Sequence, residues 1–175
     1  MNAIICRYNS NGQDFNRNFP EFFQSGKGSE MQAEARAISE WMKANQFILS
    51  ASLHGGALVA SYPFDNKEHV GVLTNFRGYQ ESATPDDDTF RHLATTYSLA
   101  HRKMADAAPC YAGDSRFVNG TTNGAKWYYL AGGMQDFNYV WNGCMELTLE
   151  VSCCKYPPAR QLPEFWLDNR EVIRE

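Results

Sequence analysis

The chain has 175 residues, of which 43% are hydrophobic and 14% aromatic, and its formal net charge at pH 7 is −4. A chain of this length forms one domain or part of one and can bury a sizeable core. Because there is no basic excess, the composition gives no support to a nucleic-acid-binding or membrane-surface protein. No apolar run reaches the roughly 18 residues of a membrane-spanning helix, and the apolar patch in MNAIICRYNSNG is too short for a signal peptide.

The chain contains five cysteines, none of them in a Cys-x-x-Cys pair, which argues against a cysteine-bound zinc site. Because their number is odd, at least one is unpaired or pairs outside the chain, and the sequence leaves the other pairings open. The triplet Asn119-Gly120-Thr121 is a glycosylation acceptor if the protein is secreted. The cysteines are Cys6, Cys110, Cys144, Cys153 and Cys154.

Residues 5–24 are rich in Asn, Gly and Asp, which predicts an irregular loop. Arg7 and Arg17 lie among small amide side chains, and Phe15 and Phe19 are expected to pin the loop to the body of the protein. An arginine beside amides suits the binding of a carboxylate, because its planar guanidinium donates two parallel hydrogen bonds. The alternative is that both arginines are solvated loop charges.

A helix is predicted to begin at Ser29, because Ser29 and Gln32 have the spacing of a capping box. The apolar residues 47–53 then predict a buried strand, so this segment has the helix–strand order of alternating α/β folds. The apolar residues at helical spacing are Met31, Ala35, Ile38 and Met42.

His54 ends the predicted strand, and Gly55 and Gly56 follow at once. Paired glycines after a strand indicate a sharp turn or a close approach of the backbone to another group. A histidine at the carboxyl end of a core strand can face a cleft in an α/β sheet. The alternative is a core histidine beside a tight turn.

A second helix is predicted to have Thr84 as its cap and Pro85 at its first position, and to end at Pro109. The three aspartates after the proline favour the positive end of the helix dipole and are interpreted as a solvated helix start. Residues 66–83 before it are expected to form a loop. The expected buried stripe consists of Phe90, Leu93, Ala94, Tyr97 and Met104.

Residues 110–143 are rich in glycine and aromatic residues and are predicted to be mostly loop. This region can be a binding wall or a packed long loop, and the composition does not decide between them. Near the end of the chain, residues 162–174 predict a terminal helix.

Residues 145–152 alternate strictly between apolar and polar, which predicts a strand. The alternation places Glu146 and Glu150 on one face, although glutamate is disfavoured in central strands. One interpretation is a half-exposed edge strand with a wet face. The other is a carboxylate aimed into a cleft as a general base.

Five blocks of sequence stand out: NRNFP at 16–20, LHGG at 53–56, YPFD at 62–65, AGGMQDFNY at 131–139 and LEVSCCKYP at 149–157. Together they resemble the zinc metallocarboxypeptidases, most closely the regulatory branch of carboxypeptidases E, D, N and M. The resemblance covers nearly the whole chain in one order. It implies an α/β fold, a mixed central sheet with helices on both faces, in which residues 1–175 are part of one peptidase domain without a second domain.

The resemblance also implies the chemistry of the site. His54 matches the third zinc ligand, Glu150 the catalytic glutamate, and Arg7 the arginine that stabilises the oxyanion. Zinc lowers the pKa of bound water and polarises the scissile carbonyl, and the glutamate passes the water proton to the leaving amine. A positioned cation stabilises the charge that grows in the transition state.

The remaining matches are to substrate-binding groups. Asn16, Arg17 and Tyr128 match the residues that hold the substrate's terminal carboxylate, and we expect them to converge in one pocket near His54. Gln135 matches the bottom of the specificity pocket, and Asp65 matches the acidic residue that binds a Lys or Arg side chain in this branch.

One departure concerns the metal. The family's first two zinc ligands lie in a His-x-x-Glu motif, and none of the four histidines here has Glu three positions later. A catalytic zinc normally needs three protein ligands, so one histidine is insufficient. We therefore expect an amino-terminally truncated and incomplete domain, with exposed apolar sheet surface, weak zinc binding and no peptidase activity of its own.

The favoured hypothesis is a domain of a zinc carboxypeptidase that releases C-terminal Lys or Arg from peptides and proteins in the secretory pathway or outside the cell. The alternative is a non-catalytic protein that keeps the pocket for a peptide carboxylate and only binds. Retention of Glu150 argues for the enzyme, because a pure binding protein has no need of a base. The missing His-x-x-Glu pair argues for the alternative.

Overall fold

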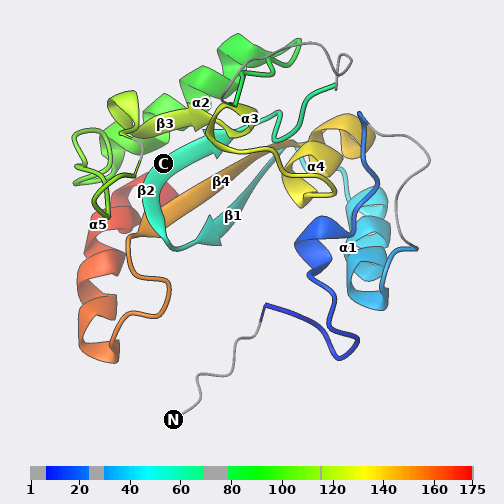
Figure 1. Ribbon diagram of the computed structural model, residues 1–175, viewed down its shortest axis with the longest axis horizontal. Coiled ribbons are helices and arrows are strands. Elements are labelled where there is room, and N and C mark those ends of the chain that lie inside the picture. The colour runs from blue at the N-terminus through cyan, green and yellow to red at the C-terminus, as the bar shows by residue number, and fades with distance from the viewer. Residues whose placement is uncertain (1–6, 24–29, 69–78, 115, 175) are drawn as a thin grey trace.

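Figure 1 shows the computed structural model, which describes residues 7–23, 30–68, 79–114 and 116–174. Its centre is a four-stranded mixed sheet with the strand order β1-β4-β2-β3, and helices lie on both faces, as predicted. Within these ranges no helix combines the length and apolar character needed to cross a membrane. The strands are β1 (Leu49–His54), β2 (Ala57–Tyr62), β3 (Thr121–Asn123) and β4 (Met145–Ser152), and the helices are α1 (Ala33–Ala44), α2 (Asp87–Ala100), α3 (Gly124–Trp127), α4 (Met134–Asn142) and α5 (Leu162–Arg174).

The turn between β1 and β2 carries the chain across the end of β4. β4 pairs in parallel with β1 and antiparallel with β2, so two strands that are consecutive in sequence flank a third. Gly56 donates its backbone N–H to the Ser152 carbonyl oxygen over 2.7 Å. It has a φ of +131°, and a Cβ there would lie 2.7 Å from Cε of Lys155. A side chain at Gly56 would therefore be strained and crowded, which confirms the sharp turn expected from the paired glycines.

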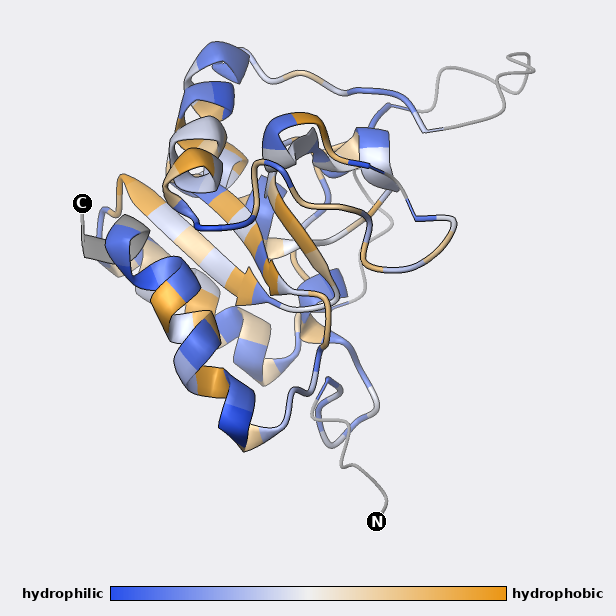
Figure 2. Ribbon diagram, turned by 90° about the vertical axis from the view of Figure 1, so that its left-hand side faces the viewer, coloured by the Kyte–Doolittle hydropathy of each residue, from blue (hydrophilic) through white to orange (hydrophobic). Residues whose placement is uncertain are grey.

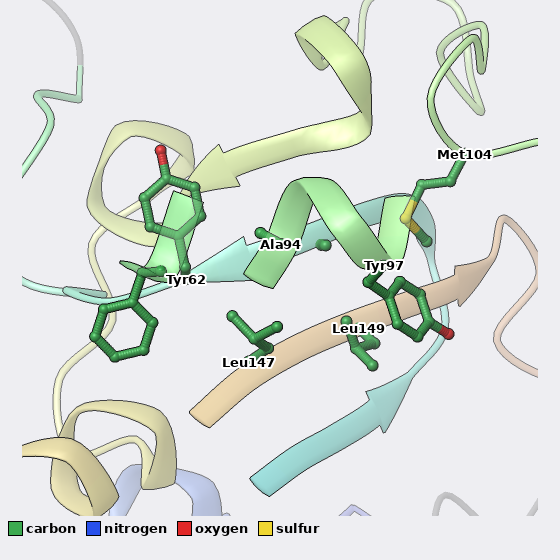
Figure 3. Close-up of a cluster of buried hydrophobic side chains, with 8 residues drawn as sticks. Tyr62, Ala94, Tyr97, Met104, Leu147 and Leu149 are labelled. Atoms are coloured by element: carbon green, nitrogen blue, oxygen red, sulfur yellow. The ribbon is translucent and has the colours of Figure 1, made fainter. Parts of the chain in front are cut away.

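The apolar core lies between the sheet and α2. Leu147 and Leu149 project from β4 toward α2, where they meet Ala94 and Tyr97 (Figure 3). α5 packs beside α2, and the Tyr97 hydroxyl donates to Oδ1 of Asn169 over 2.5 Å. The buried cluster consists of Ala60, Tyr62, Phe90, Ala94, Tyr97, Met104, Leu147 and Leu149.

The opposite face of the sheet is polar. Because side chains alternate along a strand, Glu146, Thr148 and Glu150 of β4 face away from α2. α4 covers part of this face, and its residue Phe137 packs on Phe19 with ring centroids 5.0 Å apart. Figure 2 shows the more hydrophobic strands enclosed between helices that carry hydrophilic residues along their lengths. The register places Ser50, Ser52 and His54 of β1 beside Glu146, Thr148 and Glu150 of β4.

Three predicted helix boundaries are wrong. α1 begins after Gln32, four residues later than predicted, and Ser29 lies outside the described residues. α2 begins three residues after the predicted cap Thr84 and ends at Ala100, well before Pro109. The early end has a local cause, because Nδ1 of His101 accepts the backbone N–H groups of Lys103 and Met104 at 3.1 Å.

The burial of two strands differs from the sequence-based expectation. Residues 47–53 do contain a strand, but β1 forms the edge of the sheet, and Leu49 and Leu53 are 54% and 61% exposed. β4 is a central strand, so the interpretation of residues 145–152 as a wet edge is wrong. Glu146 and Glu150 are only 1% and 5% exposed. The exposed leucines agree with the expectation of uncovered apolar sheet surface.

Residues 110–143 contain more regular structure than the composition suggested, namely β3, α3 and α4. The glycine Gly143 was interpreted as a loop signal, yet it adopts a φ of +60° directly after α4 and acts as its left-handed C-cap. Phe19 is buried and pins the loop as expected, whereas Phe15 is 37% exposed. The terminal helix has the predicted bounds.

A disulfide joins Cys110 to Cys153, 43 residues apart in sequence. We expect the double substitution Cys110→Ala/Cys153→Ala to lower the free energy of unfolding by about 2–4 kcal/mol, because the disulfide removes loop-closure entropy from the unfolded chain. Urea unfolding of the purified chain measures this. Cys154→Ala, at an exposed free cysteine, is the control and should leave stability nearly unchanged. An equal loss in both variants would contradict a stabilising role for the disulfide.

Candidate functional site

A small cavity of about 60 Å³, here called the cleft, opens on the polar face where β1 and β4 end. Ligands of open α/β sheets bind at the carboxyl ends of strands, so the position suits a functional site. Seven of the eight residues predicted from the sequence line this one cavity, among them the three expected to converge near His54. The lining residues are Arg7, Asn16, Arg17, Ser52, His54, Ser61, Asp65, Gly124, Trp127, Tyr128, Leu130, Thr148 and Glu150.

His54 and Glu150 form a pair at the base of the cleft. They are register partners at the ends of two parallel strands, and Nδ1 of His54 lies 3.0 Å from each carboxylate oxygen of Glu150. The His54 side chain is 41% exposed, whereas that of Glu150 is 7% exposed. The pair thus presents an accessible imidazole that is oriented by a buried carboxylate, which excludes the alternative of a core histidine.

Arg17 is held at the cleft by a close approach between two loops. Its Nη1 donates to the Asn16 carbonyl oxygen over 2.7 Å, and Oδ1 of Asn16 accepts the backbone N–H of Met134 at the start of α4. Gly132 packs so closely that a Cβ there would lie 2.7 Å from the Arg17 carbonyl oxygen. The absence of a side chain at Gly132 therefore allows the loop with Asn16 and Arg17 to dock at the start of α4.

Tyr128 lies between the charged groups of the cleft. Burial raises the pKa of its hydroxyl, the carboxylates of Asp65 and Glu150 raise it further, and the guanidinium groups of Arg17 and Arg7 lower it. All four side chains are thus near enough to act electrostatically on this hydroxyl. Because the net pKa shift is upward, Tyr128 is protonated at neutral pH and can donate a hydrogen bond.

Arg7 lines the cleft but already has an anionic partner. Its Nη2 lies 2.6 Å from Oδ2 of Asp14, whose other carboxylate oxygen accepts the backbone N–H of Asn16. The side chain of Arg7 is partly exposed. The structure therefore brings Arg7 to the site, with Asp14 positioning its guanidinium beside the Asn16–Arg17 loop.

Asp65 and Gln135 form the acidic wall of the cleft. Nε2 of Gln135 donates to Oδ1 of Asp65 over 2.8 Å, and both residues are buried. Burial raises the pKa of Asp65 to about 7, with Arg17 opposing the rise and Glu146 and Glu21 adding to it. A Cβ at Gly124 would lie only 1.9 Å from Oδ1 of Asp65, so the carboxylate needs a glycine beside it. Gln135 does not line the cavity itself and reaches it through Asp65.

Several polar residues of the site were not among those predicted from the sequence. Ser52, Ser61 and Thr148 line the cleft, and Asp136 lies behind Asp65. The alternation of residues 145–152 had already placed Thr148 on the face of Glu150, so this signal was present. The two serines gave no signal, because small hydroxyl residues occur in strands of every kind.

The residues of the cleft do not complete a metal site. In the ranges that the structure describes, no three His, Cys, Asp or Glu side chains gather into a group that could hold a metal ion. A catalytic zinc normally takes three protein ligands, and of the expected set the cleft contributes His54. The described residues therefore do not fit a self-sufficient zinc centre.

Comparison with solved structures identifies the fold. The chain is similar to carboxypeptidase A from Helicoverpa armigera, with a TM-score of 0.63 and 14% identity over 93% of this chain and 40% of that one. It is also similar to thrombin activatable fibrinolysis inhibitor, with a TM-score of 0.57 and 19% identity. At these identities the likeness establishes the architecture, which is that of a carboxypeptidase.

The chain belongs to the zinc carboxypeptidase family, whose model matches residues 3–172. It is 50% identical to mouse (Mus musculus) carboxypeptidase M over 169 residues, which are 97% of this chain and 37% of that protein. It is 48% identical to human carboxypeptidase D over 95% of this chain and 12% of that protein. It is 43% identical to the human carboxypeptidase N catalytic chain over 97% of this chain and 40% of that protein. The chain thus spans less than half the length of these relatives.

Proposed function

We propose that this chain is the substrate-recognition and general-base part of a zinc carboxypeptidase that removes C-terminal Lys or Arg from peptides. The observation that carries the proposal is the presence of opposite charges in one cleft, with Arg17 and Asp65 near the His54–Glu150 pair. An arginine fork suits a terminal carboxylate, and a buried carboxylate suits a cation that would otherwise be desolvated without a partner.

The acidic wall supports a cationic rather than an apolar side chain in the pocket. Oε1 of Gln135 is buried without a hydrogen-bond partner among the described residues, beside the carboxylate of Asp65. Both oxygens are acceptors, and the guanidinium or ammonium group of a terminal Arg or Lys supplies only donors. A substrate cation would therefore satisfy a buried acceptor and pair with a buried carboxylate.

Glu150 is the candidate general base and Arg7 the candidate oxyanion-stabilising group. The carboxylate of Glu150 is buried, is oriented by its contact with His54 and faces the cleft that would hold the scissile bond. In this proposal His54 would be one ligand of the zinc that the family implies, and the described residues supply no complete ligand set around it. That metal supplies polarisation of the carbonyl and acidification of water when it is bound.

Binding to the isolated chain tests the recognition half of the proposal. We expect a short peptide with a free C-terminal arginine to bind at least about tenfold more tightly than the same peptide with a C-terminal amide, because the amide removes the charge that Arg17 holds. Isothermal titration calorimetry with the 175-residue chain measures both affinities. Equal affinities would show that the cleft does not recognise the terminal carboxylate.

The second candidate function is a binding protein without catalysis, and the incomplete metal site favours it for this chain. We expect less than one equivalent of zinc to remain after dialysis, and no release of C-terminal Arg, because one histidine does not hold or orient the ion. Atomic absorption and an amino-acid release assay measure the two. Stoichiometric zinc with chelator-sensitive turnover would show that further ligands exist in the chain and would favour the enzyme.

We also propose that the protein is secreted or enters the secretory pathway. The Cys110–Cys153 disulfide supports this proposal, because disulfides persist in oxidising compartments. The glycosylation acceptor Asn119 is exposed, which is the position that such a modification requires.

A further inference from the structure

Asp136 was not among the site residues predicted from the sequence. Its carboxylate binds the backbone N–H of Asp65. Asp136 lies in the first turn of α4 and is buried. Its two carboxylate oxygens accept the backbone N–H of Asp65 at 2.8 and 3.1 Å, and the backbone N–H of Asn66 also donates to it. The position of the Asp65 carboxylate in the cleft therefore depends on Asp136.

The surroundings of Asp136 are predominantly acidic. Burial raises its pKa well above the usual range, and the charges of Asp65 and Glu21 add to the rise, against the backbone N–H groups that lower it. The charges that act on Asp65 itself are Arg17, Glu146 and Glu21, and only the first is a cation. The raised pKa values show that the two carboxyl groups resist being ionised together, so a substrate cation placed beside them would favour their ionised forms.

We infer that Asp136 is a second specificity-determining residue of the cleft, a positioning residue that fixes Asp65 and adds buried negative charge for the terminal Lys or Arg of a substrate. This inference rests on the proposed function. A cation bound at Asp65 would lie near both carboxylates, and Coulombic attraction in a buried site is weakly screened. A neutral side chain of the same shape would gain nothing from the second charge.

The test compares peptides that end in arginine with peptides that end in citrulline, which has nearly the same shape without the charge. With the unaltered chain, arginine should bind more tightly than citrulline. Asp136→Asn keeps the size and one acceptor for the backbone, so it should lower the arginine-to-citrulline preference roughly tenfold while citrulline affinity stays unchanged. Equal losses for both peptides would reduce Asp136 to a structural support, and an unchanged preference would likewise overturn the inference.

Asp65→Asn in the same assay separates this inference from the proposed function. If Asp65→Asn leaves the preference for arginine intact, the proposed function fails, whatever Asp136 does. If Asp65→Asn removes the preference and Asp136→Asn does not, only the inference fails.

Carboxyl-carbon NMR of the unaltered chain gives a readout that needs no variant, should Asp136→Asn fail to fold. The titration midpoint of Asp136 should fall when the arginine peptide binds, because a nearby cation favours the ionised carboxylate, and it should stay the same with the citrulline peptide. A midpoint that does not respond to the arginine peptide would overturn the inference.

Discussion

Arg17→Ala should weaken binding of a peptide with a free C-terminal arginine about a hundredfold. The guanidinium is the cation of the Asn16–Arg17 loop, and this loop is fixed to the start of α4 by the hydrogen bond from Met134 to Asn16. Removing one partner of a hydrogen-bonded charge pair costs roughly 2–5 kcal/mol, because the other charge is left unpaired. Titration calorimetry gives the affinity of the variant and of the unaltered chain under the same conditions.

Two matched variants sharpen this result. Arg17→Lys keeps the charge and loses the planar fork, so we expect an intermediate loss of about tenfold. Arg36→Ala removes an exposed arginine that pairs with Glu30 beside α1, and it should leave the affinity unchanged. If Arg17→Ala binds as tightly as Arg36→Ala, Arg17 does not hold the terminal carboxylate.

Asp65→Asn should stabilise the chain at pH 8 while it removes the preference for terminal arginine. Burial raises the pKa of Asp65 to about 7 from an ordinary value of 3.8. The folded chain therefore holds this proton more tightly than the unfolded chain, and stability falls as pH rises from about 4 to about 7. Above that window the buried charge carries its full penalty, and the neutral asparagine avoids it.

Thermal unfolding measures the stability effect. We expect Asp65→Asn to raise the melting temperature at pH 8 by roughly 5–15 °C, which corresponds to about 2–4 kcal/mol, and to change it little at pH 4. Asp88→Asn, at an exposed aspartate in the first turn of α2, is the matched control and should not produce this pH-dependent gain. A lower melting temperature of Asp65→Asn at pH 8 would contradict this expectation, because it would show that the Asp65 carboxylate stabilises the fold.

The sequence predicted β4 and α5 with their observed bounds, because strict alternation and helical spacing are strong local signals. The prediction that β1 is buried was wrong, because the position of a strand within a sheet depends on which other strands pair with it. α4 was not predicted, because the glycines on either side of it, Gly132, Gly133 and Gly143, were interpreted as signs of a loop. Gly143 is in fact the C-cap of the helix.

The site was predicted from the resemblance more than from local patterns. Alternation alone put Glu150 on a polar face, and paired glycines alone put His54 at a turn, but neither brought the two together. Their contact depends on the parallel register of β1 and β4, which no local pattern specifies. The role inferred for Asp136 depends on a contact between a helix and a loop 71 residues away in sequence, which no spacing rule contains.

A crystal structure of the chain with a bound acyl-arginine would show whether Arg17 and Asp65 hold the two charged ends of a terminal arginine. We expect the ligand carboxylate to accept hydrogen bonds from Arg17, and the ligand guanidinium to lie within hydrogen-bond distance of Asp65 and Gln135. A larger hollow of about 660 Å³ adjoins the cleft at Trp127 and Tyr128 and offers an alternative location. A ligand bound there, or bound in the cleft with its guanidinium away from Asp65, would contradict the proposed roles of Arg17 and Asp65.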